Sequence, residues 1–220
     1  MKYLHKLVLH YYKDRDYSHD YNHVFKVYNI ANKIAKNERI INKRQLLIIK
    51  CASLFHDVWD NKYVKSKKDK EILQLELRKD LENIKISKEE IDDIYKIIEN
   101  ISYTKEKKQR NKNERIYLKR INKLREIVSD SDKIESTGKE GIIRIIEYER
   151  MIKENESVMY YIKKVKDLYK NRILDIIEND YIRTKSGKEI IKERMKDMES
   201  IINDEKELYM LVDEIINKEN

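Results

Sequence analysis

The residues best suited to chemistry are the adjacent pair His56-Asp57, which directly follows a mostly apolar run from Leu46 to Phe55. Two polar groups at the end of a buried helix need a partner, because burying them unpaired costs several kcal/mol. An imidazole and a carboxylate are both good ligands for a divalent cation. A helix-terminal histidine beside a solvated carboxylate is the simpler interpretation of this pair when it is taken alone.

Two other segments carry similar residues. The upstream segment runs from Ser18 to His23 as Ser-His-Asp-Tyr-Asn-His, and the downstream segment runs from Asp130 to Gly138 as Asp-Ser-Asp-Lys-Ile-Glu-Ser-Thr-Gly. Helical spacing places both Asp130 and Asp132 in line with apolar core positions of the preceding residues. Periodicity alone therefore does not choose between these two aspartates.

Together the three segments resemble the HD superfamily of metal-dependent phosphohydrolases, in its small bacterial nucleotide pyrophosphohydrolase branch. That branch has Ser-His-Asp-x-x-His, then His-Asp-x-x-Asp-x-Lys, then Asp-Ala-Asp-(Arg/Lys)-Leu-Asp-x-x-Gly. The resemblance covers most of the chain, from about Tyr17 to Arg194. It implies an all-α fold and one divalent cation, of the kind of Mn²⁺, Mg²⁺, Ni²⁺ or Co²⁺. The ligands that the resemblance implies are His23, His56, Asp57 and Asp132.

The resemblance also implies roles for residues around the ion. Asp60 would orient or deprotonate the attacking water, and Lys62 would contact phosphate. Lys26 stands where the branch more often has arginine, so it keeps the charge but loses the bidentate fork. His19 is a candidate to contact phosphate or the leaving group, or to support a metal ligand. We expect Asp130 to support a ligand, or a basic residue near the phosphates, through a hydrogen bond.

The implied reaction is hydrolysis of a nucleoside triphosphate to monophosphate and pyrophosphate. Water would attack the α-phosphorus, with Asp60 positioning it. Glu135 replaces the aspartate usual in the third motif, which leaves substrate preference open. A 5′-nucleotidase or a cyclic-nucleotide phosphodiesterase needs the same metal centre. The alternative that is not an enzyme is a non-catalytic module that binds a nucleotide or RNA.

The elements that position these residues are expected to be helices nearly throughout, because the 220 residues include no proline and three glycines. We expect an HD-domain helical bundle with additional C-terminal helices, as one domain over 1–220. Its metal-binding core covers about 17–145, and a C-terminal helical cover takes up about 146–220. These last helices cover the core or pair with a second subunit, so a homodimer stays open.

Spacing of apolar residues and capping signals predict the individual helices. The stretch 105–113 is expected to be a loop. The predicted helices are 2–12, one from Asp20 or Asn22 into the thirties, 42–59, 72–81, one that starts at Ser87, 116–128, 142–151, 159–177 and 187–216.

The net charge of +8 suggests an anionic partner, and the densest basic stretch runs from Lys105 to Arg125. Acidic residues number 41 against 49 basic ones, and Tyr117 is the one aromatic candidate for stacking there, so nucleic acid is not favoured over a nucleotide substrate. The single cysteine, Cys51, fits a reducing compartment. The sequence has neither a membrane-spanning stretch nor a signal-peptide pattern, and we expect a cytoplasmic protein.

Overall fold

The computed structural model describes residues 2–16 and 19–217, and these ranges contain helices and no strand. The expected all-α class is confirmed. The N-terminal helices are α1 (Lys2–Tyr12), α2 (Tyr21–Asn37), α3 (Lys43–Phe55), α4 (Lys67–Asn83), α5 (Lys88–Ile98), α6 (Tyr103–Arg110) and α7 (Asn122–Glu135). The C-terminal helices are α8 (Gly138–Ile152), α9 (Val158–Leu168), α10 (Leu174–Glu178), α11 (Lys185–Asn203) and α12 (Glu205–Ile216). Two short elements join them: the 3₁₀ turn η2 (Lys119–Ile121) and the π-helical turn η3 (Tyr169–Ile173).

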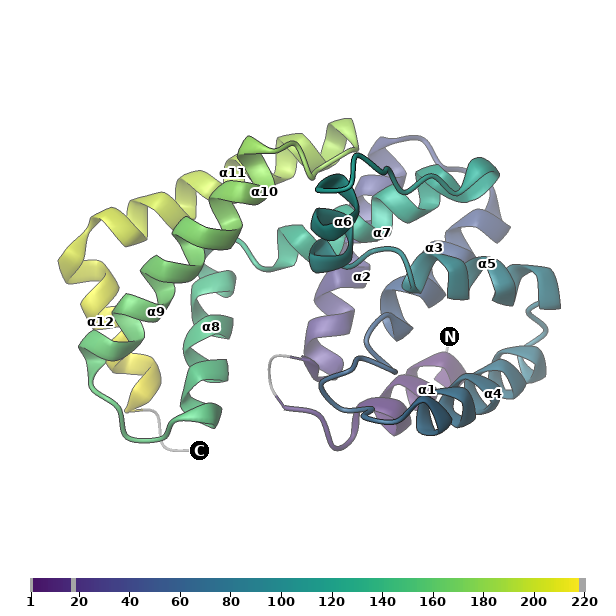
Figure 1. Ribbon diagram of the computed structural model, residues 1–220, viewed down its shortest axis with the longest axis horizontal. Coiled ribbons are helices and arrows are strands. Elements are labelled where there is room, and N and C mark those ends of the chain that lie inside the picture. Colours follow the sequence, from purple (N-terminus) through teal and green to yellow (C-terminus); the bar gives the residue numbers. More distant parts are fainter. Residues whose placement is uncertain (1, 17–18, 218–220) are drawn as a thin grey trace.

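The N-terminal helices pack around α3, which lies between α2, α5 and α7 (Figure 1). Its residues from Cys51 to Phe55 are all buried, as expected for an inner helix. Helix α2 also packs along α7. The upstream histidine segment, the His-Asp pair and the downstream aspartate segment are therefore carried by three helices in mutual contact.

Helix α3 ends at Phe55 and does not run on to Trp59 as its sequence suggests. His56 is the C-cap residue, and the chain then turns, with Asp60 N–H donating to the Asp57 carbonyl at 3.0 Å. Tertiary contacts take the place of the missing helical bonds. The Asp57 N–H donates to the hydroxyl of the buried Tyr12 at 3.3 Å, and these contacts hold the His-Asp pair at the mouth of the helix.

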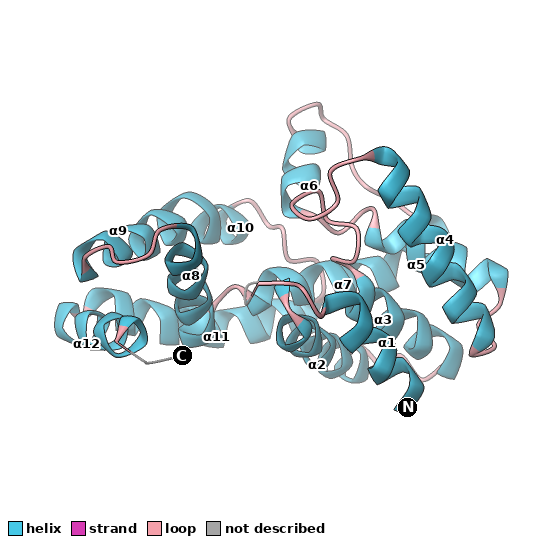
Figure 2. Cartoon of the chain, turned by 90° about the horizontal axis from the view of Figure 1, so that it is seen from below, coloured by secondary structure: helices cyan, strands magenta, loops and turns pink. Residues whose placement is uncertain are grey.

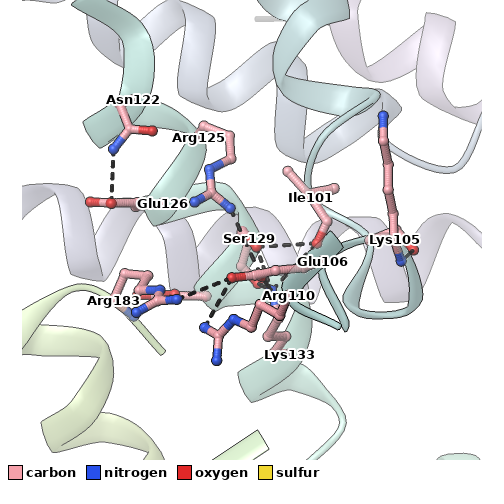
Figure 3. A network of polar contacts seen from close by, with 12 residues as sticks. Ile101, Lys105, Glu106, Arg110, Asn122, Arg125, Glu126, Ser129, Lys133 and Arg183 are labelled. Carbon is pink, nitrogen blue, oxygen red and sulfur yellow. Dashed lines mark hydrogen bonds and ion pairs between the residues drawn. The ribbon is translucent and has the colours of Figure 1, made fainter. Parts of the chain in front are cut away.

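Residues 103–110 form helix α6, so the expectation of a loop over 105–113 is wrong for most of its length. The Ser102 side chain caps this helix by accepting from the Lys105 N–H at 3.5 Å. Glu106 explains why so polar a stretch is ordered. Its carboxylate is buried against Lys133 at 3.2 Å and has Arg125 at 3.9 Å, within the network of Figure 3. A hydrophobic pattern cannot reveal an anchor that is itself charged.

The junction of α7 and α8 depends on two glycines. Gly138 has φ +74°, a left-handed conformation that disfavours other residues. At Gly141 a Cβ would lie 2.3 Å from the Ser136 carbonyl oxygen, so the backbones approach too closely for any side chain. Helix α7 itself begins at Asn122 and not at residue 116 as expected. The tight junction sets α8 beside the end of α7 that carries Asp132.

The C-terminal helices pack mainly on one another, and α8, α9, α11 and α12 gather on the left in Figures 1 and 2. Helix α11 connects this group to the rest through its contacts with α7 and α2. The expected helix over 187–216 is broken at Asp204, which caps α12 by accepting from the N–H groups of Lys206 and Glu207. Within residues 2–16 and 19–217, no helix combines the length and the apolar character that crossing a bilayer requires.

Candidate metal centre and its cavity

Four side chains from α2, the end of α3 and α7 meet at one point. The Nε2 atoms of His23 and His56 lie 3.2 Å apart. Asp57 Oδ2 lies 3.4 Å from the first Nε2 and 3.3 Å from the second. Asp132 Oδ1 lies 3.8 Å and 3.5 Å from the same two atoms. The structure thus brings together all four residues that the sequence motifs single out.

Each imidazole is oriented through its other nitrogen. His56 Nδ1 donates to the Ser53 carbonyl oxygen at 2.8 Å, so its Nε2 faces the carboxylates. His23 Nδ1 lies 3.2 Å from Glu135 Oε2, close enough for an ion pair but without the alignment of a good hydrogen bond. Glu135 is also ion-paired with Arg144. Partners of this kind fix the tautomer and the angle of metal-binding histidines.

The two carboxylates of the cluster are charged and favour positive charge beside them. Burial raises the pKa of Asp132, but the His56 imidazole outweighs it and holds the pKa well below the usual aspartate range. The pKa of Asp57 is lowered in the same way, with burial opposing and His56 prevailing. Burial lowers the pKa of His56, yet the two carboxylates raise it to about 9.

These features fit a divalent cation. Two ligands bound at about 2.1 Å to one octahedral ion lie about 3 Å apart, close to the spacing of the His23 and His56 nitrogens. Two inward-facing imidazole nitrogens and two carboxylates form the mixed donor set of a first-row divalent metal or Mg²⁺. His23, His56, Asp57 and Asp132 are therefore the residues that would hold the ion.

The cluster opens into a cavity of about 790 Å³ that lies between the N-terminal helices and the C-terminal group. Four basic and four acidic side chains line it, so a divalent ion would leave an excess of positive charge. Trp59, Tyr103 and Tyr148 supply aromatic walls. The charged lining residues are Lys70, Lys105, Arg144 and Arg172, with Asp57, Asp60, Glu99 and Asp132.

Asp60 and His19 both line this cavity. Asp60 reaches it from the turn after α3, not from a continuing helix, and its Oδ1 accepts from the Lys62 N–H at 2.7 Å. The ring of His19 lies edge-on to that of His23, with centroids 6.0 Å apart. Burial lowers the pKa of His19. Both residues are thus close to the ligand cluster without belonging to it.

Neither Lys62 nor Lys26 is among the described residues that line the cavity. Lys62 Nζ lies 2.9 Å from Asp16 Oδ2 and 4.2 Å from the ring centroid of Tyr148. Lys26 is half-buried on α2, one turn beyond His23. Lys62 therefore lies beside Tyr148, an aromatic wall of the cavity, with its charge near Asp16.

Asp130 points to a different part of the molecule from Asp132. Its carboxylate accepts from the Thr184 N–H and hydroxyl, each at 2.7 Å, and from the Arg183 N–H at 3.0 Å. These bonds fix the segment that leads into α11. Burial raises the pKa of Asp130 to about 6. The partners of the carboxylate are therefore two backbone N–H groups and the Thr184 hydroxyl, just before α11, and no metal-ligand candidate is among them.

Sequence motifs did not reveal the two arginines of the cavity, Arg144 and Arg172. Both lie on C-terminal helical segments, where no motif marks them. A signal was present for the first of them, because Arg144 interrupts the apolar run Ile-Ile-Arg-Ile-Ile on the predicted helix over 142–151. A single charge inside an apolar run indicates a buried polar site.

The comparisons with known proteins agree with this geometry. The HD domain family model matches residues 20–137, which include all four candidate ligands. No curated protein sequence gives a significant match. Among solved structures, a Lactobacillus plantarum protein is 18% identical, with a TM-score of 0.67 over 95% of this chain and 96% of that one.

Two other solved structures are similar. Bacillus subtilis YpgQ in complex with ADP is 22% identical, with a TM-score of 0.63 over 91% of this chain and 92% of that one. An HD-superfamily hydrolase from Bacillus thuringiensis is 19% identical, with a TM-score of 0.63 over 92% of each chain. At these identities the structures establish the fold, and the family model establishes the family. The chain therefore belongs to the HD domain family and is a metal-dependent phosphohydrolase.

Proposed function

We propose that the protein is a nucleoside triphosphate pyrophosphohydrolase. The observation that carries this proposal is the cavity at the ligand cluster, which has about 790 Å³ of space and carries arginines as well as aromatic walls. Cavities of a few hundred to about 1,000 Å³ hold ligands of nucleotide size. The similar Bacillus subtilis protein was solved in complex with ADP, which supports a nucleotide here.

In the proposed reaction, water attacks the α-phosphorus and the bond from that phosphorus to the pyrophosphate oxygen breaks. A divalent ion at the cluster supplies Lewis acidity, which favours deprotonation of water and offsets charge on phosphoryl oxygens. Asp60 faces the same cavity and accepts the proton of the attacking water. Arg144 and Arg172 hold phosphate oxygens.

The remaining lining residues fit the leaving group and the base. His19, whose pKa is lowered by burial, stays neutral near pH 7 and donates a hydrogen bond to a phosphate oxygen. Trp59 lines the cavity and also packs edge-on against Tyr95, with ring centroids 4.9 Å apart. It offers a rigid wall for the base. Lys62 and Lys26 take part through the positive field near the cavity and not through contact.

A small anionic substrate suits the surface better than nucleic acid does. Residues of the basic stretch are ion-paired within the protein. The pairs are Lys107 with Asp175 at 3.1 Å, Arg110 with Glu106 at 3.2 Å, Arg120 with Asp93 at 2.9 Å and Lys123 with Glu38 at 2.7 Å. Cations held in this way contribute less to a phosphate-binding face.

The decisive experiment is a substrate screen with Mn²⁺, Mg²⁺, Ni²⁺ or Co²⁺ over nucleoside triphosphates, monophosphates and cyclic monophosphates. We expect pyrophosphate from triphosphates, and in ¹⁸O-labelled water the label should enter the monophosphate product. Phosphate release from monophosphates would support a 5′-nucleotidase, and ring opening would support a cyclic-nucleotide phosphodiesterase. Bound metal without any turnover would support a non-catalytic module. Each of these outcomes would contradict the proposal.

A further inference from the structure

The helical rod that runs from α9 into α10 contains the π-helical turn η3 (Tyr169–Ile173). In this turn the Leu174 N–H donates to the Tyr169 carbonyl, five residues back and not four. Such turns are rare, and they occur frequently at functional sites. The turn carries Ile173, which is buried in the core, and Arg172, which lines the cavity of the ligand cluster.

Arg172 differs from the other cations of the cavity in its partners. Arg144 is ion-paired with Glu135. Lys105 Nζ donates to the Glu99 carbonyl oxygen at 2.7 Å. The fourth cation, Lys70, lies 3.7 Å from the carboxylate of the same glutamate.

Within the described part of the chain, Arg172 has no ion pair and no hydrogen bond from its side chain. Its guanidinium lies over the ring of Tyr103, whose centroid is 5.4 Å from the guanidinium carbon. An aromatic ring stabilises a cation without taking up its N–H donors. All donors of this fork are therefore available to a ligand in the cavity.

The surroundings of Arg172 favour an anion. The side chain of Arg172 is exposed, and its surface lines the cavity. Desolvation by nearby protein atoms lowers the pKa of Arg172, whereas Asp132 raises it. Arginine remains charged in proteins, so the guanidinium presents its charge and its N–H donors to the cavity. A phosphate group that reaches from the ligand cluster into the cavity would pair with this charge.

We infer that Arg172 binds the pyrophosphate portion of the substrate, the phosphates that become the leaving group. This inference rests on the proposed function, because it names which part of the nucleoside triphosphate the residue contacts. The guanidinium fork matches two oxygens of a phosphate, and it stabilises the charge that builds on pyrophosphate as the bond to the α-phosphorus breaks. Arg172 is thus a substrate-binding residue supplied by the C-terminal helices.

The test compares three variants of the metal-loaded protein. Arg172→Gln removes the charge and the fork, and Arg172→Lys keeps the charge alone. The matched control is Lys170→Gln, because Lys170 is an exposed cation of the same π turn that does not line the cavity. The measurements are the affinity for inorganic pyrophosphate by calorimetry, the affinity for Mn²⁺, and steady-state kinetics on nucleoside triphosphate and on bis-p-nitrophenyl phosphate.

We expect Arg172→Gln to weaken pyrophosphate binding by about 10- to 100-fold, the range for a lost charge-assisted contact, with an intermediate loss for Arg172→Lys. Mn²⁺ affinity should stay at the wild-type level in both variants. Turnover of the small diester, which has no pyrophosphate, should fall by a smaller factor than turnover of the nucleoside triphosphate. Lys170→Gln should match wild type throughout.

Wild-type pyrophosphate affinity in Arg172→Gln, or equal losses in Arg172→Gln and Lys170→Gln, would overturn the inference. An equal loss on the diester would do the same, because it would reveal a structural role. The proposed function fails separately, if the wild-type protein hydrolyses no nucleoside triphosphate. The calorimetric comparison would still decide whether Arg172 binds pyrophosphate in that case.

Discussion

The carboxylate of Glu135 lies 3.2 Å from Nδ1 of His23, on the side of the imidazole away from the Asp57 and Asp132 carboxylates. Glu135 is buried and also ion-paired with Arg144. Burial raises the pKa of Glu135, but Arg144 and His23 lower it to about 2, so the carboxylate is charged at neutral pH. A charged partner behind a histidine strengthens that histidine as a metal ligand.

Replacing Glu135 by glutamine should therefore weaken Mn²⁺ affinity by about 10- to 100-fold, as measured by calorimetric titration, because the imidazole loses the group that orients it. Glu126→Gln is the control, since Glu126 lies on the same helix and bonds Asn122 away from the cluster. Equal affinities in wild type and Glu135→Gln would show that the 3.2 Å contact does not support His23.

Asp132 and Asp130 should respond differently to the same change. Asp132→Asn should weaken metal binding by more than the 10- to 100-fold typical of an outer partner, because an amide is a poor substitute for a ligand carboxylate. Asp130→Asn should leave metal affinity near wild type. It should lower the free energy of unfolding by about 1–3 kcal/mol, because one of the two oxygens that accept from the Thr184 and Arg183 N–H groups becomes an NH₂ donor. If Asp130→Asn loses more metal affinity than Asp132→Asn, then Asp130 is the metal ligand and Asp132 is not.

Variants of Asp57 and Asp60 should distinguish the role of a metal ligand from the role of a general base. Asp57→Ala should abolish hydrolysis and release the metal, because Asp57 lies within 3.4 Å of both imidazole nitrogens. Asp60→Ala should abolish most hydrolysis and keep the metal, because Asp60 lines the cavity outside the cluster. Elemental analysis and product release measure the two properties on the same samples. Comparable metal loss in both variants would refute the division.

The buried Glu106 should be needed for stability, because it neutralises the cations around it (Figure 3). Burial raises the pKa of Glu106, but Lys133 and Arg125 outweigh it and lower the pKa overall. Glu106→Gln should lower the free energy of unfolding by about 3 kcal/mol or more, the cost of leaving Lys133 buried without its counter-charge. Urea unfolding measures it. Glu114→Gln, an exposed change nearby, should cost much less, and equal costs would argue against the network.

Glu38 should make stability depend on pH. It accepts from Lys123 Nζ at 2.7 Å and from the Ser186 N–H at 2.8 Å, and so ties α2 to α7 and α11. Burial raises the pKa of Glu38, but these donors outweigh it and lower the pKa from 4.5 to about 2. Because the folded pKa lies below the unfolded one, the stabilisation is fully present above 4.5 and is lost as the pH falls to about 2.

The stability difference between wild type and Glu38→Gln should therefore be largest near neutral pH and shrink between about pH 4.5 and pH 2. The measurement is the free energy of unfolding of both metal-free proteins at several pH values. Taking the difference between the two proteins cancels the effects of acid that they share. A difference that stays constant over this range would show that the carboxylate charge of Glu38 does not stabilise the fold.

The helical class and most helix starts could be predicted because the signals are local. The Ser87 capping box, the Asp20 cap and the apolar stripes each act within a few residues of chain. The end of α3 at Phe55 could not be predicted, because the bond that replaces its helical pairing comes from Tyr12, far away in the sequence. Helix α6 was missed for a similar reason, since its anchor Glu106 is polar and its partners lie on other helices.

The candidate site divides in the same way. The motifs single out His23, His56, Asp57 and Asp132, and the structure brings their side chains together. The cavity arginines could not be placed from the sequence, because helices without motifs carry them. For the two lysines, the motif resemblance predicts phosphate contacts. It does not reveal the competing contact of Lys62 with Asp16, which depends on side-chain packing between distant segments.

The cavity has walls from two parts of the chain, and this has an evolutionary consequence. All four candidate ligands lie within the family segment 20–137, whereas the cavity arginines follow it on helices that pack mostly on each other. Apart from Arg144, which pairs with Glu135 behind His23, residues of these later helices can change and reshape the surface that faces a substrate while the ligand cluster stays intact. A lineage can in this way acquire a new substrate without passing through an ancestor that has lost its metal.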